Sequence, residues 1–309
     1  MIRQASTKRE NKRKYAKRKL MVKRICILIS ITFLFAVIGR TIILTKENKN
    51  IENSNHSTKE IKEKVTNRHI DYKMERPQKR TRKEALKQIS KWAKKDKQME
   101  EIYHHRDTYP DDMLKALANN PELAEFMVGY YKDTVKVKHG KLSKKEIKSE
   151  FPLLLQWDKR WGYAPYGDSI IGIAGCGPTC LSMVIVAMTG DKSATPYQLA
   201  KYSENNGYYV EGIGTSWALM SDAVTDYGIR THQISADEVI MKEELKKGHM
   251  LICSMREGDF TSEGHFIVIY GSKKGKFLIN DPNSRSRSKK KWSYHILKNQ
   301  IRAVWTYYA

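Results

Sequence analysis

Cys176 is the residue in this sequence whose neighbours best suit a chemical nucleophile. It stands in the segment Gly175-Cys176-Gly177-Pro178, and a helix accepts proline, which has no N–H to donate, only within its first turn. The segment therefore predicts a helix that begins at or just before Cys176. Unpaired N–H groups and the positive end of the helix dipole favour a thiolate there. The flanking glycines predict that a substrate can approach the backbone closely; a buried structural cysteine is the alternative interpretation.

A cysteine nucleophile needs a base, and His265 is the histidine with a geometric argument. Two strand-like runs, 265–270 and 276–281, are joined by a short loop. Symmetric pairing about the middle of that loop places His265 directly opposite Asp281, where Cβ atoms lie about 5 Å apart. The carboxylate would then accept a hydrogen bond from Nδ1 and leave Nε2 for the thiol. If the two side chains were on opposite faces, Asn280 would be the next candidate.

The elements that must position these groups indicate an α+β arrangement. Apolar residues recur at helical spacing from Cys176 to Met188, which predicts a buried helix, and Cys180 falls on its core face. Short apolar runs separated by Gly and Lys/Ser turns predict strands at 250–254, 265–270, 276–281 and 303–308. One Cys-headed helix followed by antiparallel strands is typical of an α+β domain.

The order Cys, His, acid on a helix and then on strands resembles papain-like cysteine peptidases. Within that group, GCGPTC at 175–180, GHFIVI at 264–269 and the Asp-Pro at 281–282 resemble the peptidase C39-like family, relatives of the double-glycine leader peptidases. The resemblance covers residues 151–309. It implies a papain-like fold in which the Cys-bearing helix packs on an antiparallel sheet, a peptide or protein substrate, and no metal or cofactor.

The resemblance also suggests a role for Gln156. The family has a Gln before the Cys whose side chain helps to form the oxyanion hole, and Gln156, twenty residues ahead of Cys176, is the matching candidate. Its amide and the backbone N–H of Cys176 would be two oxyanion donors; a polar residue at a strand end is the alternative. The chain has no GxxxxGK[ST] phosphate loop and no multi-helix membrane region, so we do not expect an ATP-driven transporter.

The N-terminal part predicts a membrane anchor. Residues 25–44 are apolar or weakly polar apart from Arg40, and twenty helical residues rise about 30 Å, the thickness of the hydrocarbon core. Eleven basic residues and one acidic residue precede them in residues 1–24, which predicts a cytoplasmic N-terminus and an extracellular remainder. A cleaved signal peptide is the alternative, although no A-x-A-like site follows the run.

The segments between the anchor and the domain carry no predicted chemistry. Residues 45–82 are polar and charged, typical of a flexible linker, and residues 83–150 predict a helical stalk, with a helix start after Pro110 and another at Pro121. The net charge of the chain is +23, but residues 151–309 hold only +4 of it. Because the excess lies in tail and linker rather than on a folded face, nucleic-acid binding is not expected.

The sequence therefore predicts a single-pass, membrane-anchored thiol hydrolase that cleaves a peptide or related amide bond. Cys176 would attack the carbonyl, His265 would carry the proton, Asp281 would orient His265, and Gln156 would help to bind the oxyanion. Two alternatives stay open on the same fold. One is a catalytically silent module that binds a peptide or a cell-wall polymer, and the other is a thiol acyltransferase or transpeptidase.

Overall fold

The computed structural model describes residue 72, residues 74–132 and residues 139–309. The predicted membrane span 25–44, the basic tail 1–24 and most of the linker 45–82 lie outside these residues. Among the helices that the structure describes, none is long and apolar enough to cross a membrane.

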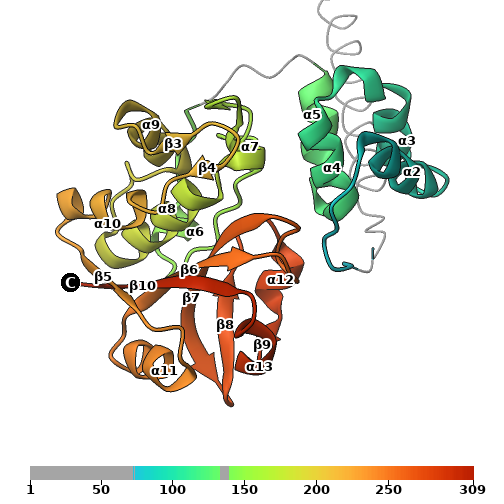
Figure 1. Ribbon diagram of the computed structural model, residues 1–309. Coiled ribbons are helices and arrows are strands. Elements are labelled where there is room, and N and C mark those ends of the chain that lie inside the picture. The colour runs from blue at the N-terminus through green and yellow to red at the C-terminus, as the bar shows by residue number, and fades with distance from the viewer. Residues whose placement is uncertain (1–71, 73, 133–138) are drawn as a thin grey trace, which may run out of the picture. The chain divides into compact units, whose positions relative to one another are not determined.

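A six-stranded antiparallel sheet is the centre of the C-terminal domain (Figure 1), with strand order β5-β10-β6-β7-β8-β9. The strands are β5 (Arg230–Ile234), β6 (Met250–Arg256), β7 (Gly264–Lys273), β8 (Lys276–Asn280), β9 (Lys291–Trp292) and β10 (Ile301–Tyr308). The sequence predicted the four central strands and missed both edges. β5 is mostly polar and exposed, and β9 has only two residues, so neither carries the apolar alternation that indicates a strand.

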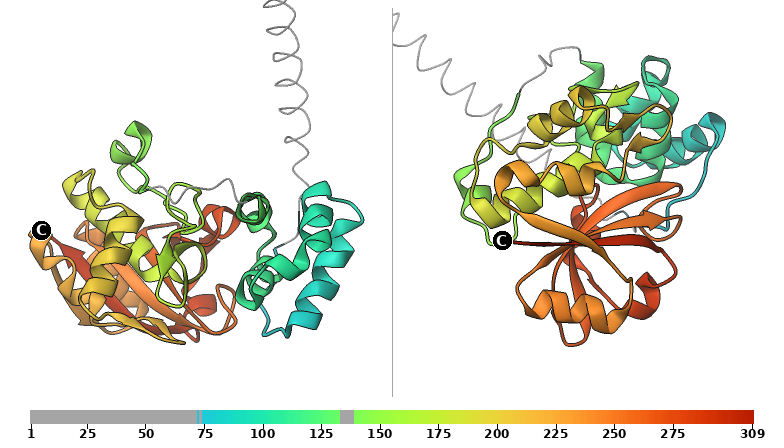
Figure 2. Two further views of the ribbon diagram at one scale, coloured as in Figure 1. Left: turned by 90° about the horizontal axis from the view of Figure 1, so that it is seen from above. Right: turned by 60° about the vertical axis from the view of Figure 1, so that its left-hand side comes forward.

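Helices cover both faces of the sheet (Figure 2). Helix α8 (Cys176–Thr189) packs on β7 from one side, and α11 (Glu238–Lys246) packs on the other. Successive residues of β7 alternate between the two hydrophobic layers: Phe266 and Val268 join the α8 layer, whereas Ile267 and Ile269 join the α11 layer. A strand buried on both faces has to be apolar throughout, which explains the continuous apolar run after His265.

The predicted helical stalk is a set of short helices. They are α2 (Arg82–Ala93), α3 (Lys97–His104), η1 (Arg106–Thr108), α4 (Asp111–Asn119), η2 (Pro121–Leu123) and α5 (Ala124–Tyr131). Thr81 begins α2 with a capping box to Glu84. The helix starts predicted after Pro110 and at Pro121 are confirmed. We call residues 72–132 the helical segment.

The helical segment shares a hydrophobic cluster with the domain that follows it. The rings of Phe126 and Tyr163 stack with centroids 4.4 Å apart, and Leu155 and Trp157 are buried in the same cluster as Ile89.

The remaining short elements are α6 (Lys144–Ile147), β1 (Pro165–Tyr166), β2 (Ser169–Ile170), α7 (Ile171–Ala174), α9 (Pro196–Asn205), β3 (Tyr209–Val210), β4 (Gly214–Thr215), α10 (Leu219–Asp222), η3 (Thr225–Tyr227), α12 (Arg285–Lys289) and α13 (Tyr294–Leu297). The domain is a mixed α/β fold.

Candidate active site

Cys176 is the first residue of α8, as predicted. Gly175 is the N-cap, and Pro178 lies in the first turn, where the missing N–H leaves no hydrogen bond unmade. Cys176 is a free, half-buried thiol, whereas Cys180, one turn further along α8, is completely buried. Burial is the main cause that raises the pKa of Cys180 well above its ordinary value. Of these two cysteines, only Cys176 is placed to react.

The glycines beside Cys176 are required by the packing around the start of α8. A Cβ on Gly175 would lie 2.6 Å from Ile171, and a Cβ on Gly177 would lie 2.8 Å from the Thr215 side chain. Neither distance is tolerated between real atoms. The two glycines therefore let α7 and β4 close tightly around the start of α8.

The predicted pairing of β7 and β8 is wrong in detail. The loop has two residues rather than five: Lys273 pairs with Lys276, and Lys274 and Gly275 have φ values of 53° and 76°. Positive φ at both central positions is typical of the tight turns that match the twist of a hairpin. The hairpin is therefore centred further along the chain than the predicted Lys273.

His265 and Asp281 nevertheless lie on the same face of the sheet, because β7 contains an irregularity. The pairing register shifts by one residue between Ile269 and Gly271. When this register is extended beyond the end of β8, Ile267 rather than His265 lies directly opposite Asp281. A slip of two residues keeps both side chains on one face. Diagonal neighbours are within reach of long side chains, and His265 Nε2 lies 2.8 Å from Asp281 Oδ1. Asn280 instead donates from Nδ2 to the backbone carbonyl of Pro152, 3.1 Å away.

The two ring nitrogens of His265 have the reverse of the predicted roles. Nε2 contacts the Asp281 carboxylate, which leaves Nδ1 for the thiol. Burial, the largest influence, lowers the pKa of His265. The charge and hydrogen bond of Asp281, together with a hydrogen bond to Cys176, outweigh it and raise this pKa to about 9. An imidazolium that persists at neutral pH is the partner that a thiolate requires.

Asp281 is completely buried and fully engaged. Its Oδ1 also accepts from the backbone N–H of Asn283 at 2.8 Å, and its Oδ2 accepts from Nε of Arg287 at 2.5 Å. Burial raises the pKa of Asp281, but the charges of Arg287 and His265 and their hydrogen bonds lower it to about 2. The carboxylate is therefore ionised at every pH at which the site could work. Arg287 could not be identified from the sequence, because it lies in the basic run RSRSKKK and nothing distinguishes it from its neighbours there.

Gln156 lies beside the site, but its amide is occupied. It is buried, and Nε2 donates to the backbone carbonyls of Gly172 at 3.1 Å and Ile173 at 2.9 Å, while Oε1 is buried without a hydrogen-bond partner among the described residues. In this arrangement Gln156 holds the chain that leads into Cys176. To donate to an oxyanion, its amide has to give up one of these two carbonyls.

Cys176, His265 and Gln156 line one cleft of about 390 Å³. Its walls come from the C-terminal domain and, unexpectedly, from the helical segment, to which the sequence assigned no chemistry. The helical segment supplies Pro77, Gln78, Lys79, Arg80, Asp112, Lys115, Ala116, Asn119 and Asn120. The sequence could not reveal this wall, because α4 is an ordinary amphipathic helix whose position depends on distant packing.

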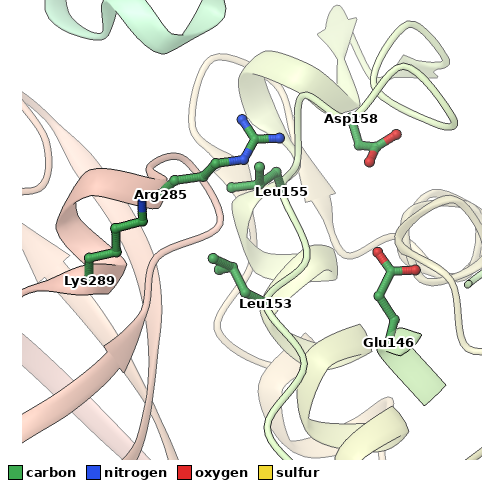
Figure 3. Close-up of a pocket in the computed structure, with 6 residues that line it drawn as sticks. All are labelled: Glu146, Leu153, Leu155, Asp158, Arg285 and Lys289. Carbon is green, nitrogen blue, oxygen red and sulfur yellow. The ribbon is translucent and has the colours of Figure 1, made fainter. Parts of the chain in front are cut away.

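A second pocket, of about 210 Å³, lacks a nucleophile (Figure 3). Figure 3 shows Arg285 and Lys289 on one side and the carboxylates of Glu146 and Asp158 on the other. Both carboxylates are paired with Arg160, at 2.6 and 2.8 Å. No cysteine or histidine lines this pocket. Within the described ranges, no group of three or more His, Cys, Asp or Glu side chains is placed to hold a metal ion.

A thiol at the start of a helix, in one cleft with a histidine that contacts a carboxylate, is an arrangement typical of thiol hydrolases. The sequence profile of the peptidase C39-like family matches residues 148–309. The chain belongs to this family and is a cysteine peptidase, so a peptide or protein is its substrate class.

Two of the solved structures with chains similar to this one are the following. One is the peptidase domain of Streptococcus ComA, described as a bifunctional ABC transporter of a quorum-sensing pathway; it is 22% identical, with 43% of this chain and 89% of that chain covered and a TM-score of 0.35. The other is a Bacillus anthracis protein described as a C39-like peptidase, 13% identical, with 55% and 98% covered and a TM-score of 0.33. No curated protein matches the chain.

Proposed function

We propose that this chain hydrolyses a peptide or related amide bond through Cys176, His265 and Asp281. The observation that carries the proposal is the arrangement in the cleft, which Cys176 and His265 line together and in which Nε2 of His265 lies 2.8 Å from the Asp281 carboxylate. Each of the three groups has the neighbour that its role requires.

The reaction follows from these positions. His265 holds the proton of Cys176, so that the thiolate attacks the carbonyl carbon and a C–S bond forms. His265 then gives its proton to the leaving amine as the C–N bond breaks, which leaves a thioester on Cys176. Water, deprotonated by His265, hydrolyses the thioester and restores the thiol. Asp281 stays ionised and fixes the ring throughout.

The oxyanion of each tetrahedral intermediate needs donors near Cys176. The backbone N–H of Cys176, at the first position of α8, is one of the N–H groups that a helix leaves without an intrahelical partner. We propose Gln156 as the second donor, with its amide turning from the carbonyl of Gly172 or Ile173 to the intermediate. The proximity of Gln156 to Cys176 in the cleft supports this role.

Selective alkylation tests the proposal. The purified full chain is treated with iodoacetamide at pH 6, and the labelled cysteines are identified by mass spectrometry. We expect rapid labelling at Cys176 and none at Cys180 or Cys253, which are buried and serve as internal controls. Labelling of Cys176 that begins only near the ordinary cysteine pKa of about 8.5 would show an unactivated thiol and contradict the proposal.

We further propose that residues 25–44 anchor the chain in the cell membrane, with residues 1–24 in the cytoplasm and the linker, helical segment and peptidase domain outside. The apolar run and the basic residues before it support this topology. A protease that cannot enter intact cells should then remove the peptidase domain. If the domain is protected until the membrane is broken, the proposed topology is reversed. If the mature chain is found to start near residue 45, the span is a cleaved signal peptide.

A further inference from the structure

The short helix α12 holds Asp281 from two sides. Arg287 is only 2% exposed and donates from Nε to the Asp281 carboxylate, and Ser288 Oγ accepts from the Asp281 backbone N–H at 2.9 Å. Nη1 and Nη2 of Arg287 are buried, and within the described part of the chain neither has a hydrogen-bond partner. Because a buried, partly satisfied guanidinium is costly, packing alone does not explain Arg287. Its satisfied contact is the one to Asp281.

The position of α12 depends in turn on the helical segment. The carboxylate of Glu122 accepts hydrogen bonds from Ser284 Oγ at 2.8 Å, from the Arg285 N–H at 2.8 Å and from the Ser286 N–H at 3.0 Å. These groups are the N-cap and the first residues of α12. A helix of five residues is not stable by itself, and its first N–H groups have no partner inside the helix. Glu122 supplies that partner from more than 160 residues away.

We propose that Arg287 and Glu122 are positioning residues of the active site, Arg287 by fixing the Asp281 carboxylate against His265 and Glu122 by fixing the helix that carries Arg287. The inference rests on the proposed function, since it concerns the orientation of Asp281. It makes the helical segment part of the catalytic apparatus rather than a stalk.

The charges around Asp281 determine what a loss of positioning would do. Asp281 faces His265 from β7 and Arg287 from α12, and Cys176 and Cys180 lie nearby on α8. If Asp281 turns away, the largest of the influences that oppose burial is lost, and the pKa of His265 falls. His265 then holds a proton less well at neutral pH, so alkylation of Cys176 should require a higher pH.

The pH dependence of iodoacetamide labelling at Cys176 measures this effect in the full chain. The test variants are Arg287→Lys, which keeps the charge but not the position of Nε–H, and Glu122→Gln. Asp281→Asn gives the full size of the effect. The matched control is Glu125→Gln, because Glu125 lies on the same segment and, among the described residues, its hydrogen bond to the domain is an exposed ion pair with Lys159 at 2.7 Å.

We expect the midpoint of labelling to rise by about one pH unit or more in Asp281→Asn and nearly as much in Arg287→Lys. Glu122→Gln should raise it by a smaller amount, and Glu125→Gln should leave it unchanged. A purely structural role would lower the unfolding temperature of Glu122→Gln without moving the midpoint in the folded protein. If Arg287→Lys does not fold, the labelling midpoint of Glu122→Gln tests the inference.

The possible failures are distinct. Wild-type midpoints in both Arg287→Lys and Glu122→Gln, beside a shifted Asp281→Asn, would overturn the inference and leave the proposed function intact. A shifted labelling midpoint in Arg287→Lys but not in Glu122→Gln would show that Arg287 is a positioning residue and that Glu122 is not. An unshifted Asp281→Asn would contradict the role of Asp281 itself, and an unreactive Cys176 in the wild-type chain would contradict the proposed function.

Discussion

The Cys176 side of the cleft is built from neighbouring residues, whereas the Asp281 side is assembled from distant stretches of chain. Gly175, Gly177 and Pro178 fix the start of α8 within four residues of sequence. Asp281, by contrast, is held by His265 on β7 and by Arg287 on α12, and α12 is held by the helical segment. The first arrangement is local, and the second exists only after folding.

This difference has a physical consequence for substitutions. A change on the Cys176 side removes a reacting atom, so its effect is chemical and immediate. A change on the Asp281 side alters an orientation that several hydrogen bonds share, so its effect is partial and spread over residues from three elements. The following predictions use that contrast, in order of decreasing effect.

Cys176→Ala should abolish peptide hydrolysis, because no other group in the cleft can form the thioester. The matched control is Cys180→Ala on the same helix. It removes a completely buried sulfur, so it should lower the free energy of unfolding by about 1 kcal/mol while turnover by the folded protein stays close to wild type. Turnover rates and urea unfolding of both variants provide the check. Residual turnover in Cys176→Ala would indicate that a different residue is the nucleophile.

The contrast also explains what the sequence could and could not predict. The start of α8 was predictable, because proline and glycine act on their own backbone. The four central strands were predictable from apolar runs. α9 and α11 carry clear capping signals, Thr195-Pro196 and Asp237, which could have identified them.

The pairing of His265 with Asp281 was predicted through an incorrect register. The loop length was wrong, and the shift between Ile269 and Gly271 compensated for it by returning both side chains to one face. Nothing in the sequence marks that irregularity. Arg287 and Glu122 were not predicted, because their roles depend on contacts between segments that only the folded chain brings together.

Asp281→Asn should reduce turnover on the order of 10²–10⁴-fold. The amide removes the negative charge that stabilises the imidazolium, and it leaves one acceptor oxygen for the two donors, His265 and Arg287, that the carboxylate serves. When Asp281→Asn is added to the inactive Cys176→Ala variant, the affinity for uncleaved substrate should change little. Kinetics at saturating substrate provide the measurement, and a loss confined to KM would mean that Asp281 contacts substrate instead.

Gln156→Ala should reduce turnover on the order of 10²–10³-fold if its amide turns to the oxyanion. If Gln156 only holds the backbone carbonyls of Gly172 and Ile173, the dominant effect should be on folding stability. Comparing kcat with the urea midpoint separates the two roles. Destabilisation with unchanged kcat in the folded fraction would assign Gln156 to structure and leave the backbone N–H of Cys176 as the donor.

The smallest expected effect is a pH dependence of stability that arises from His265. Its folded pKa of about 9 lies above the ordinary value of about 6.5, so its stabilising contribution is complete below pH 6.5 and is lost as the pH rises through 9. In a Cys176→Ala background, where no thiol supplies the proton, the stability advantage of the chain with His265 over His265→Gln should therefore shrink across this window, by at most about 1.4 kcal/mol per pH unit. Urea unfolding of both proteins at pH 6, 7.5 and 9 measures it. Because the pKa of Asp281 is about 2, this carboxylate stays ionised over the whole range and does not itself make the free energy of unfolding depend on pH. A constant difference between the two proteins would show that the Asp281 side of the cleft does not hold His265 as an imidazolium.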